Sequence, residues 1–200
     1  MRRASPEITT RAIQVINENY FVYEPNPIYS DEAKNMNEQF RNVLNNRNKI
    51  DPSERKNILS KSMSFYEENN EAEAAIEDAV DQNRLMMRES FTMAIAALVS
   101  EPNDARKYFE RAKESLNEGG KTSDTMEDAY SALLVLEGLY LSEHQMFNAS
   151  DRNAMINTVN SFGNLSSSRR RLSSECCKIL DSQPAVATLQ KPVYDPSFQV

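Results

Sequence analysis

Residues 85–99 read LMMRESFTMAIAALV, and residues 132–136 read ALLVL. In both stretches the apolar side chains would lie on nearly every side of a helix, not on one stripe. That pattern is typical of helices that other helices surround. Neither stretch reaches the roughly 20 consecutive apolar residues that span a bilayer. The two stretches therefore predict an all-α bundle built around two central helices.

Helix-start signals and amphipathic stripes extend this pattern outward along the chain. Ser5-Pro6-Glu7 and Asp51-Pro52-Ser53-Glu54 each join a capping side chain, a proline and an acid, which is a typical helix start. A break is expected at Glu67–Asn70. The predicted helices cover about 5–20, 30–44, 51–66, 71–99, 103–118, 124–147, 150–162 and 165–181.

The chain is expected to form one domain. Only four glycines occur in 200 residues, and no segment alternates apolar and polar residues between turns, so no strand is predicted. The prediction is a single bundle of six to eight helices over residues 5–181, after a short N-terminal tail over 1–4. Its core is expected to bring together Phe91, Leu98, Phe109, Leu133 and Leu136.

The segment 182–200 shows no helical pattern. It contains three prolines, which exclude a continuous helix. Its apolar residues are too widely spaced to fold alone, but Tyr194 and Phe198 are large enough to anchor in pockets of another chain. We therefore expect an extended C-terminal arm outside the domain core, with Tyr194 and Phe198 as partner-binding residues.

Charge is unevenly distributed along a chain whose net charge is −7. Residues 50–102 carry eleven acidic and five basic side chains, whereas residues 152–200 carry six basic and three acidic ones. The basic tract Arg169-Arg170-Arg171 is the densest positive spot. An acidic middle argues against general nucleic-acid binding. It favours contact with copies of the same chain or with a partner of opposite charge.

One junction resembles a known repeat. Ala94-Ile95-Ala96-Ala97-Leu98 followed by Glu101-Pro102-Asn103-Asp104 is similar to the junction between tetratricopeptide repeats. No 34-residue period continues from it. The sequence therefore favours two helices joined by a turn at this point.

The one histidine, His144, follows Tyr140 by one helical turn and Glu137 by two, so all three share a helix face. Such a face would suit an acid–base or metal pair. A histidine near the negative end of a buried helix explains the pattern without any chemistry, and we prefer this interpretation. No catalytic or metal-binding residue is predicted there.

Acidic residues crowd the region 67–81. Glu77-Asp78-Ala79-Val80-Asp81 resembles the aspartate-rich motif of isoprenoid synthases, which binds magnesium and pyrophosphate, although the second motif of those enzymes is missing. Glu68-x-x-Glu71 and Glu101-x-x-Asp104 are similar to the paired motifs of helical nucleotide pyrophosphohydrolases, but a proline places the second pair in a turn. We interpret the acids as a solvated face. The alternative is a small metal-dependent hydrolase using the Glu68–Asp81 acids.

These observations favour a non-enzymatic helical protein that acts through protein–protein contacts, without a cofactor. Copies of itself or other components of a virion or other large assembly are the expected partners, through Arg169, Arg170, Arg171, Tyr194 and Phe198. Nucleic-acid contact through the arginines is the third hypothesis. No apolar signal segment follows Met1, so we expect cytoplasmic synthesis before incorporation into a particle.

Overall fold

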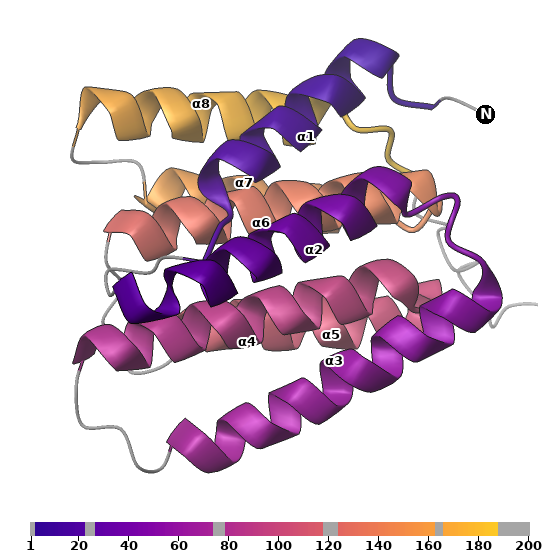
Figure 1. Ribbon diagram of the computed structural model, residues 1–200. Helices are drawn as coiled ribbons and strands as arrows, with labels where there is room; N and C mark the ends of the chain where they lie inside the picture. The colour runs from indigo at the N-terminus through magenta and orange to yellow at the C-terminus, as the bar shows by residue number, and fades with distance from the viewer. Residues whose placement is uncertain (1–2, 23–26, 74–78, 118–123, 163–165, 188–200) are drawn as a thin grey trace, which may run out of the picture.

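The computed structural model describes residues 3–22, 27–73, 79–117, 124–162 and 166–187; the side chains of residues 29, 69–73 and 79–81 also lie outside this description. Eight α-helices and one short 3-10 turn occur in the described residues, and no strand does (Figure 1). The all-α prediction is confirmed. The elements are α1 Pro6–Asn19, η1 Pro27–Tyr29, α2 Ser30–Asn46, α3 Pro52–Glu73, α4 Ala79–Val99, α5 Pro102–Asn117, α6 Asp124–Glu143, α7 Ala149–Phe162 and α8 Ser167–Ser182.

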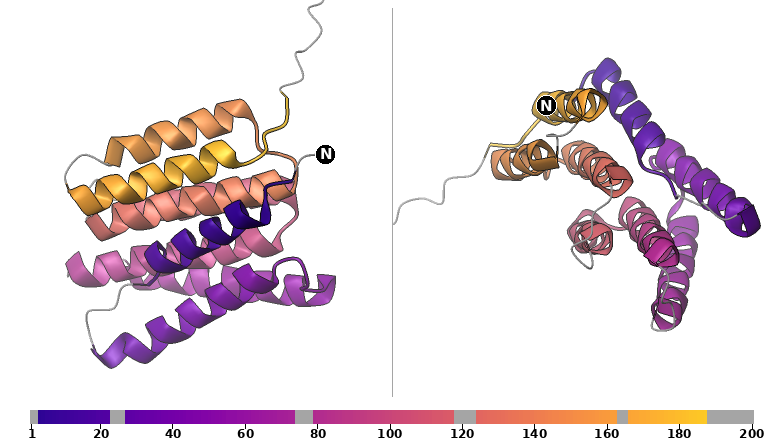
Figure 2. Two further views of the ribbon diagram at one scale, coloured as in Figure 1. Left: turned by 90° about the horizontal axis from the view of Figure 1, so that it is seen from above. Right: turned by 90° about the vertical axis from the view of Figure 1, so that its left-hand side faces the viewer.

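The helices form a row with a second layer on one face. In the row α3 packs on α4, α4 on α5, α5 on α6, and α6 on both α7 and α8. The second layer consists of α1, which crosses α6 and α8, and α2, which lies on α4. Figure 2 shows α3 and the α7–α8 pair at opposite ends of this row. No described helix is long and apolar enough to cross a membrane.

Local sequence signals set several helix ends. The Ser5 hydroxyl accepts a hydrogen bond from the Ile8 amide at 3.3 Å and caps α1. The Asp51 carboxylate accepts from the amides of Ser53 and Glu54, both at 2.9 Å, at the start of α3. These contacts satisfy amides that have no partner within their own helices. The capping interpretation of both proline motifs is confirmed.

The five predicted core residues lie in one buried cluster. Phe91, Phe109, Leu133 and Leu136 are fully buried, and Leu98 is 1% exposed. Residues 85–99 of α4 and 131–141 of α6 are all buried, on every side of the two helices. Both helices have neighbours all round, as their sequences predicted.

Close packing of α6 on α8 depends on a glycine. A Cβ atom added at Gly138 would lie 2.7 Å from Cδ2 of Leu180, closer than carbon atoms pack. The small residue thus allows α8 to lie against the buried helix.

The predicted break at Glu67–Asn70 is wrong. Helix α3 continues to Glu73, and α4 begins at Ala79 and not near Glu71. The run 67–70 contains no proline or glycine, and glutamate is a good helix former. The polar run therefore does not stop the helix.

The predicted boundary of the C-terminal arm needs correction. Gln183 is 1% exposed, and the Val186 amide donates a hydrogen bond to the Phe147 carbonyl at 2.7 Å. Ser142 Oγ donates to the Pro184 carbonyl at 3.1 Å. Residues 183–187 therefore pack on the bundle because their backbone finds partners on α6 and in the α6–α7 turn. The rest of the predicted arm, with Tyr194 and Phe198, lies outside the described residues.

Candidate functional site

The three consecutive arginines of α8 lie in three different environments. The Arg169 side chain is 8% exposed and forms ion pairs with Asp124 at 3.0 Å, with Glu127, and with Asp128 at 3.6 Å. All three acids belong to the first two turns of α6. Arg169 therefore ties α8 to α6 and is not available at the surface. The prediction that Arg169 is a partner-binding residue is therefore wrong.

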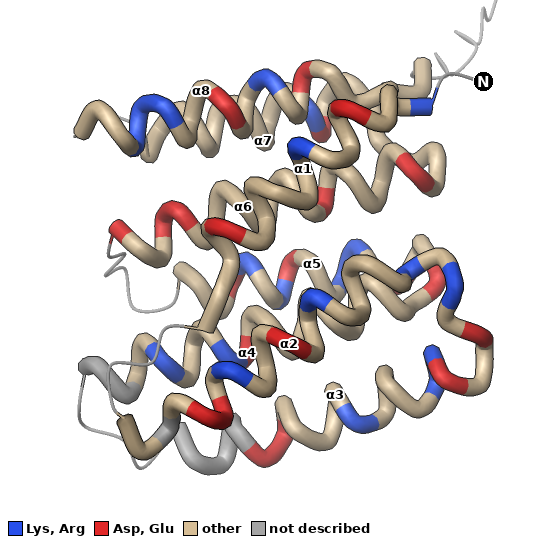
Figure 3. Tube along the Cα trace, turned by 45° about the horizontal axis from the view of Figure 1, so that its top comes forward, with Lys and Arg blue, Asp and Glu red and all other residues tan. Residues whose placement is uncertain are grey.

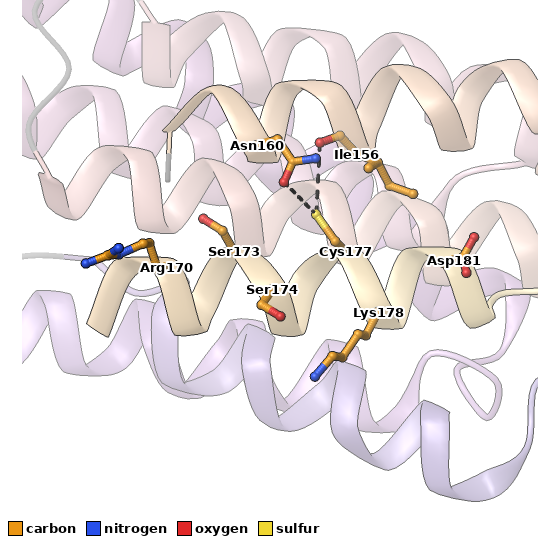
Figure 4. A pocket seen from close by; sticks show the side chains of 8 residues that line it. All are labelled: Ile156, Asn160, Arg170, Ser173, Ser174, Cys177, Lys178 and Asp181. Carbon is orange, nitrogen blue, oxygen red and sulfur yellow. Dashed lines mark hydrogen bonds between the residues drawn. The ribbon is translucent and has the colours of Figure 1, made fainter. Parts of the chain in front are cut away.

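Arg170 and Arg171 are exposed, but each lines a different hollow. Arg170 lies at the α7–α8 hollow (Figure 4), whereas Arg171 lies between α1 and α8 beside Glu175. Successive residues of a helix point about 100° apart, so a run of three cannot share one face. Their contact with a partner stays a prediction, but they do not form one continuous basic strip with Arg169.

The α7–α8 hollow is an open surface depression of about 640 Å³. Arg170, Lys178 and Asp181 line it from α8, and Asn160 lines it from α7 (Figure 4). The Cys177 thiol lies 3.4 Å from the Asn160 side-chain oxygen. Partial burial raises the pKa of Cys177, so its thiol stays protonated at neutral pH. The hollow therefore contains no activated nucleophile at Cys177.

The other cysteine is equally unreactive. Cys176 is fully buried, and burial, with a smaller contribution from Cys177, raises its pKa to about 12. Arg170-Arg171-Leu172-Ser173 matches the Arg-Arg-x-Ser pattern of basophilic kinases, and its Ser173 is 9% exposed. A kinase would reach it only if α8 opened.

Glu137 and His144 do not form a pair. The Glu137 carboxylate points to Lys113 of α5, with Nζ 2.9 Å from Oε2. His144 lies at the exposed end beyond α6, with its ring centroid 4.3 Å from that of Tyr140. Partial desolvation lowers the pKa of His144. The shared helix face exists for Tyr140 and His144, whereas the buried carboxylate of Glu137 is paired with Lys113.

Most side chains of the acidic region 67–81 lie outside the described residues. Glu67 and Glu68 are exposed on α3, but the side chains of Glu71 and of the acids up to Asp81 lie outside the described residues. Among the described side chains, no group of three acids, histidines or cysteines is arranged to hold a metal ion. The hydrolase alternative is therefore not tested.

A groove between α2 and α3 was not predicted from the sequence. Its volume is about 510 Å³, and its floor is α4, through Thr92 and Ile95. The α3 wall carries Ile58 and Phe65, both half-buried. Helix α3 has five large apolar side chains, and each is only half-buried: Ile58, Leu59, Met63, Phe65 and Tyr66.

The α2 wall of this groove carries three carboxamides beside Glu32, Met36 and Val43. Asn35, Gln39 and Asn42 line it at helical spacings of four and three residues. All three are exposed. Within the described part of the chain, only Asn42 uses its side chain, accepting from the Asn46 amide nitrogen at 2.6 Å. The groove thus joins a floor of Thr92 and Ile95 to an α2 wall on which the side chains of Asn35 and Gln39 face water.

Comparison of the chain with known protein families, with curated proteins and with solved structures gives no match.

Proposed function

We propose that the protein is a non-enzymatic assembly protein whose copies associate head to tail through the two ends of the helix row. The observation that carries this proposal is the charge at the end of α3. Four of residues 67–73 are glutamates, and no basic residue lies in the last turn of the helix.

Acids at this position are unfavourable for an isolated helix. The C-terminal end of a helix carries partial negative charge, so acidic side chains there repel it, and each costs a few tenths of a kcal/mol or more. A cationic surface from another molecule would offset this repulsion. Glu67 and Glu68, which are exposed near the end of α3, would therefore gain from a basic partner.

The opposite end of the row supplies such a surface. Arg170, Arg171 and Lys178 are exposed on α8, and only Asp181 is an exposed acid there. Figure 3 shows α8, with its basic segments, and α3 on opposite sides of the molecule. One copy cannot bring its own two ends together, but two copies can. Contacts of this head-to-tail kind generate rings or open chains, which suits a component of a virion or other large assembly.

The test is the solution mass at two salt concentrations. At about 0.05 M salt the purified chain should scatter light as a species heavier than its 22.8 kDa monomer mass. At about 0.5 M salt the mass should fall, because screening weakens the attraction. A mass of 22.8 kDa at both salts and at every concentration would contradict the proposal.

A matched pair of variants checks the surface. R170E with K178E reverses two exposed charges at the α7–α8 hollow and should weaken association. K34E with K49E makes the same charge change at exposed positions remote from α8 and should leave association unchanged. Equal loss in both variants would mean that net charge, and not this surface, controls association.

A further inference from the structure

We propose that two copies of the chain pair through α3, whose edges along the α2–α3 groove pack antiparallel about a two-fold axis near Ile58. The occupant assigned to the groove is therefore α3 of a second copy. This contact is separate from the head-to-tail association proposed above and does not depend on it.

The edge of α3 that lines the groove is not covered by α2. Helices α2 and α3 are joined by residues 47–51, but both pack on α4 and not closely on each other. Figure 1 shows α4 between them. The α3 edge consists of groove-lining residues at spacings of four, three and four, which place them on one side of the helix: Glu54, Ile58, Lys61 and Phe65.

Two residues of the α3 edge are apolar and only half-buried. Ile58 and Phe65 pack against the core, but each keeps part of its side chain in water. Both lie beside Ile95, a buried residue of the groove floor. Covering the α3 edge would remove this apolar surface from water, which favours association.

The charges of the α3 edge favour a second copy of the same edge as the partner. Glu54 and Lys61 are exposed, and neither forms an ion pair within the described part of the chain. They are seven residues apart, or about 10 Å along the helix. In an antiparallel pair centred between residues 57 and 58, Glu54 of each copy lies opposite Lys61 of the other. The α3 edge is therefore complementary to itself and gains two ion pairs.

The order of these charges also selects the orientation. A parallel pair would place Glu54 opposite Glu54 and Lys61 opposite Lys61, and like charges at close range are unfavourable. The antiparallel centre lies half a residue from Ile58, so the two Ile58 side chains face each other across the axis. Phe65 lies one turn beyond Lys61 and covers the outer side of each ion pair. Such a two-fold contact repeats every interaction twice.

The first experiment measures the mass of the full-length R170E–K178E chain by sedimentation over a range of concentrations. These two substitutions remove the proposed head-to-tail contact and leave α3 unchanged. The variant should pass from the 22.8 kDa monomer to a dimer as its concentration rises. A variant that is monomeric at every concentration would overturn the α3 pair, whereas the head-to-tail proposal would stand or fall with the wild-type chain.

A charge exchange within one chain tests the orientation. In the R170E–K178E background, E54K alone and K61E alone each replace two ion pairs by two like-charge contacts and should weaken dimerisation about tenfold. The chain with both substitutions again has opposite charges face to face and should recover most of the affinity. K56E is the matched control, because Lys56 is exposed on α3 but does not line the groove. Failure of the double exchange to recover dimerisation would overturn the antiparallel pair.

Cysteine cross-linking locates the axis. I58C should form an intermolecular disulfide under mild oxidation, because the two copies of this position meet at the axis. F65C should form none, since its two copies lie about 22 Å apart in the antiparallel pair. The chain without a new cysteine is the control, with Cys176 buried and Cys177 half-buried. Equal cross-linking of I58C and F65C, or none in a folded I58C chain, would overturn the proposal.

Discussion

The ammonium of Lys113 lies 2.9 Å from the carboxylate of Glu137, whose side chain is 3% exposed in the middle of the most buried helix. Lys113 also contacts Glu110 one turn earlier on α5, at 2.6 Å. Burial raises the pKa of Glu137, and the lysine charge opposes this rise. The pair is thus the point at which α5 neutralises a charge inside the core.

Removing one partner of this pair should be costly. Lys113→Ala leaves the Glu137 carboxylate buried without its cation, and the expected loss is about 3 kcal/mol. The double variant with Met at position 113 and Leu at position 137 should lose much less, because no charge stays buried. Urea unfolding of the three proteins measures the difference. Equal losses in the single and double variants would show that volume, not charge, matters at this position.

The same pair predicts a dependence on alkaline pH. Burial acts to lower the pKa of Lys113, but the charges and hydrogen bonds of Glu137 and Glu110 together outweigh it, so the pKa is raised. A raised pKa means that the folded chain holds this proton more tightly than the unfolded one. The resulting stability is complete below the ordinary lysine pKa, about 10.4, and is lost as the pH rises through the folded value.

Glu137→Gln removes one of the two carboxylates that raise the pKa of Lys113 and should make the fall in stability above pH 10 less steep than in the wild type. Denaturant unfolding at about pH 9, 10 and 11 compares the two proteins. The pKa of Tyr140 is raised to about 12 by burial. Tyr140 contributes equally to both proteins, so it does not affect the comparison. Parallel pH profiles would contradict the assignment.

The arginines of α8 offer a matched comparison of a buried and an exposed residue. Arg169→Ala should destabilise the fold by about 1–3 kcal/mol, because three acids at the start of α6 lose their cation. Arg170→Ala, at the neighbouring exposed position, should change stability by less than about 0.5 kcal/mol. Thermal unfolding measures both effects. Equal stability of the two variants would mean that Arg169 does not hold α8 on α6.

The core prediction is tested at Leu133, which is fully buried in α6. Leu133→Ala should cost about 2–5 kcal/mol through lost burial and the cavity left behind. Leu172→Ala is a suitable control, because Leu172 is a half-buried residue of α8. The control should lose clearly less. A loss below about 0.5 kcal/mol at Leu133 would contradict the observed packing.

His144 is expected to be dispensable. His144→Gln keeps a polar side chain at an exposed position and should alter the unfolding temperature and self-association little. Sedimentation and thermal unfolding check both. Loss of association with unchanged stability would give this residue a role that its contact with Tyr140 does not explain.

The periodicity of apolar residues was sufficient to predict the helices, but it did not predict in which direction each of several adjacent side chains points. The all-round apolar pattern of Leu85–Val99 identified a central helix, since burial on every side leaves no other solution. The tract Arg169–Arg171 looked like one basic site, because its residues are adjacent in the chain. Helical geometry turns one of them inward, and only the acids of α6 decide which one.

The groove could not be predicted for a related reason. Asn35 and Gln39 have the spacing of an ordinary solvated helix face, and nothing in the sequence places α3 beside them. Ile58 and Phe65 form the kind of stripe that most amphipathic helices bury. Only the packing of α3 at the end of the row leaves that stripe half covered.

The terminal place of α3 also decides how the molecule opens. Helix α3 packs mainly on α4, whereas α6 contacts five other helices. The amide protons of α3 should therefore exchange with solvent when this helix detaches locally, which costs less free energy than global unfolding. The amide protons of α4 and α6 should exchange only when the whole chain unfolds. A ligand bound between α2 and α3 would raise the free energy of this local detachment. Occupancy of the groove should therefore slow hydrogen exchange in α3 first.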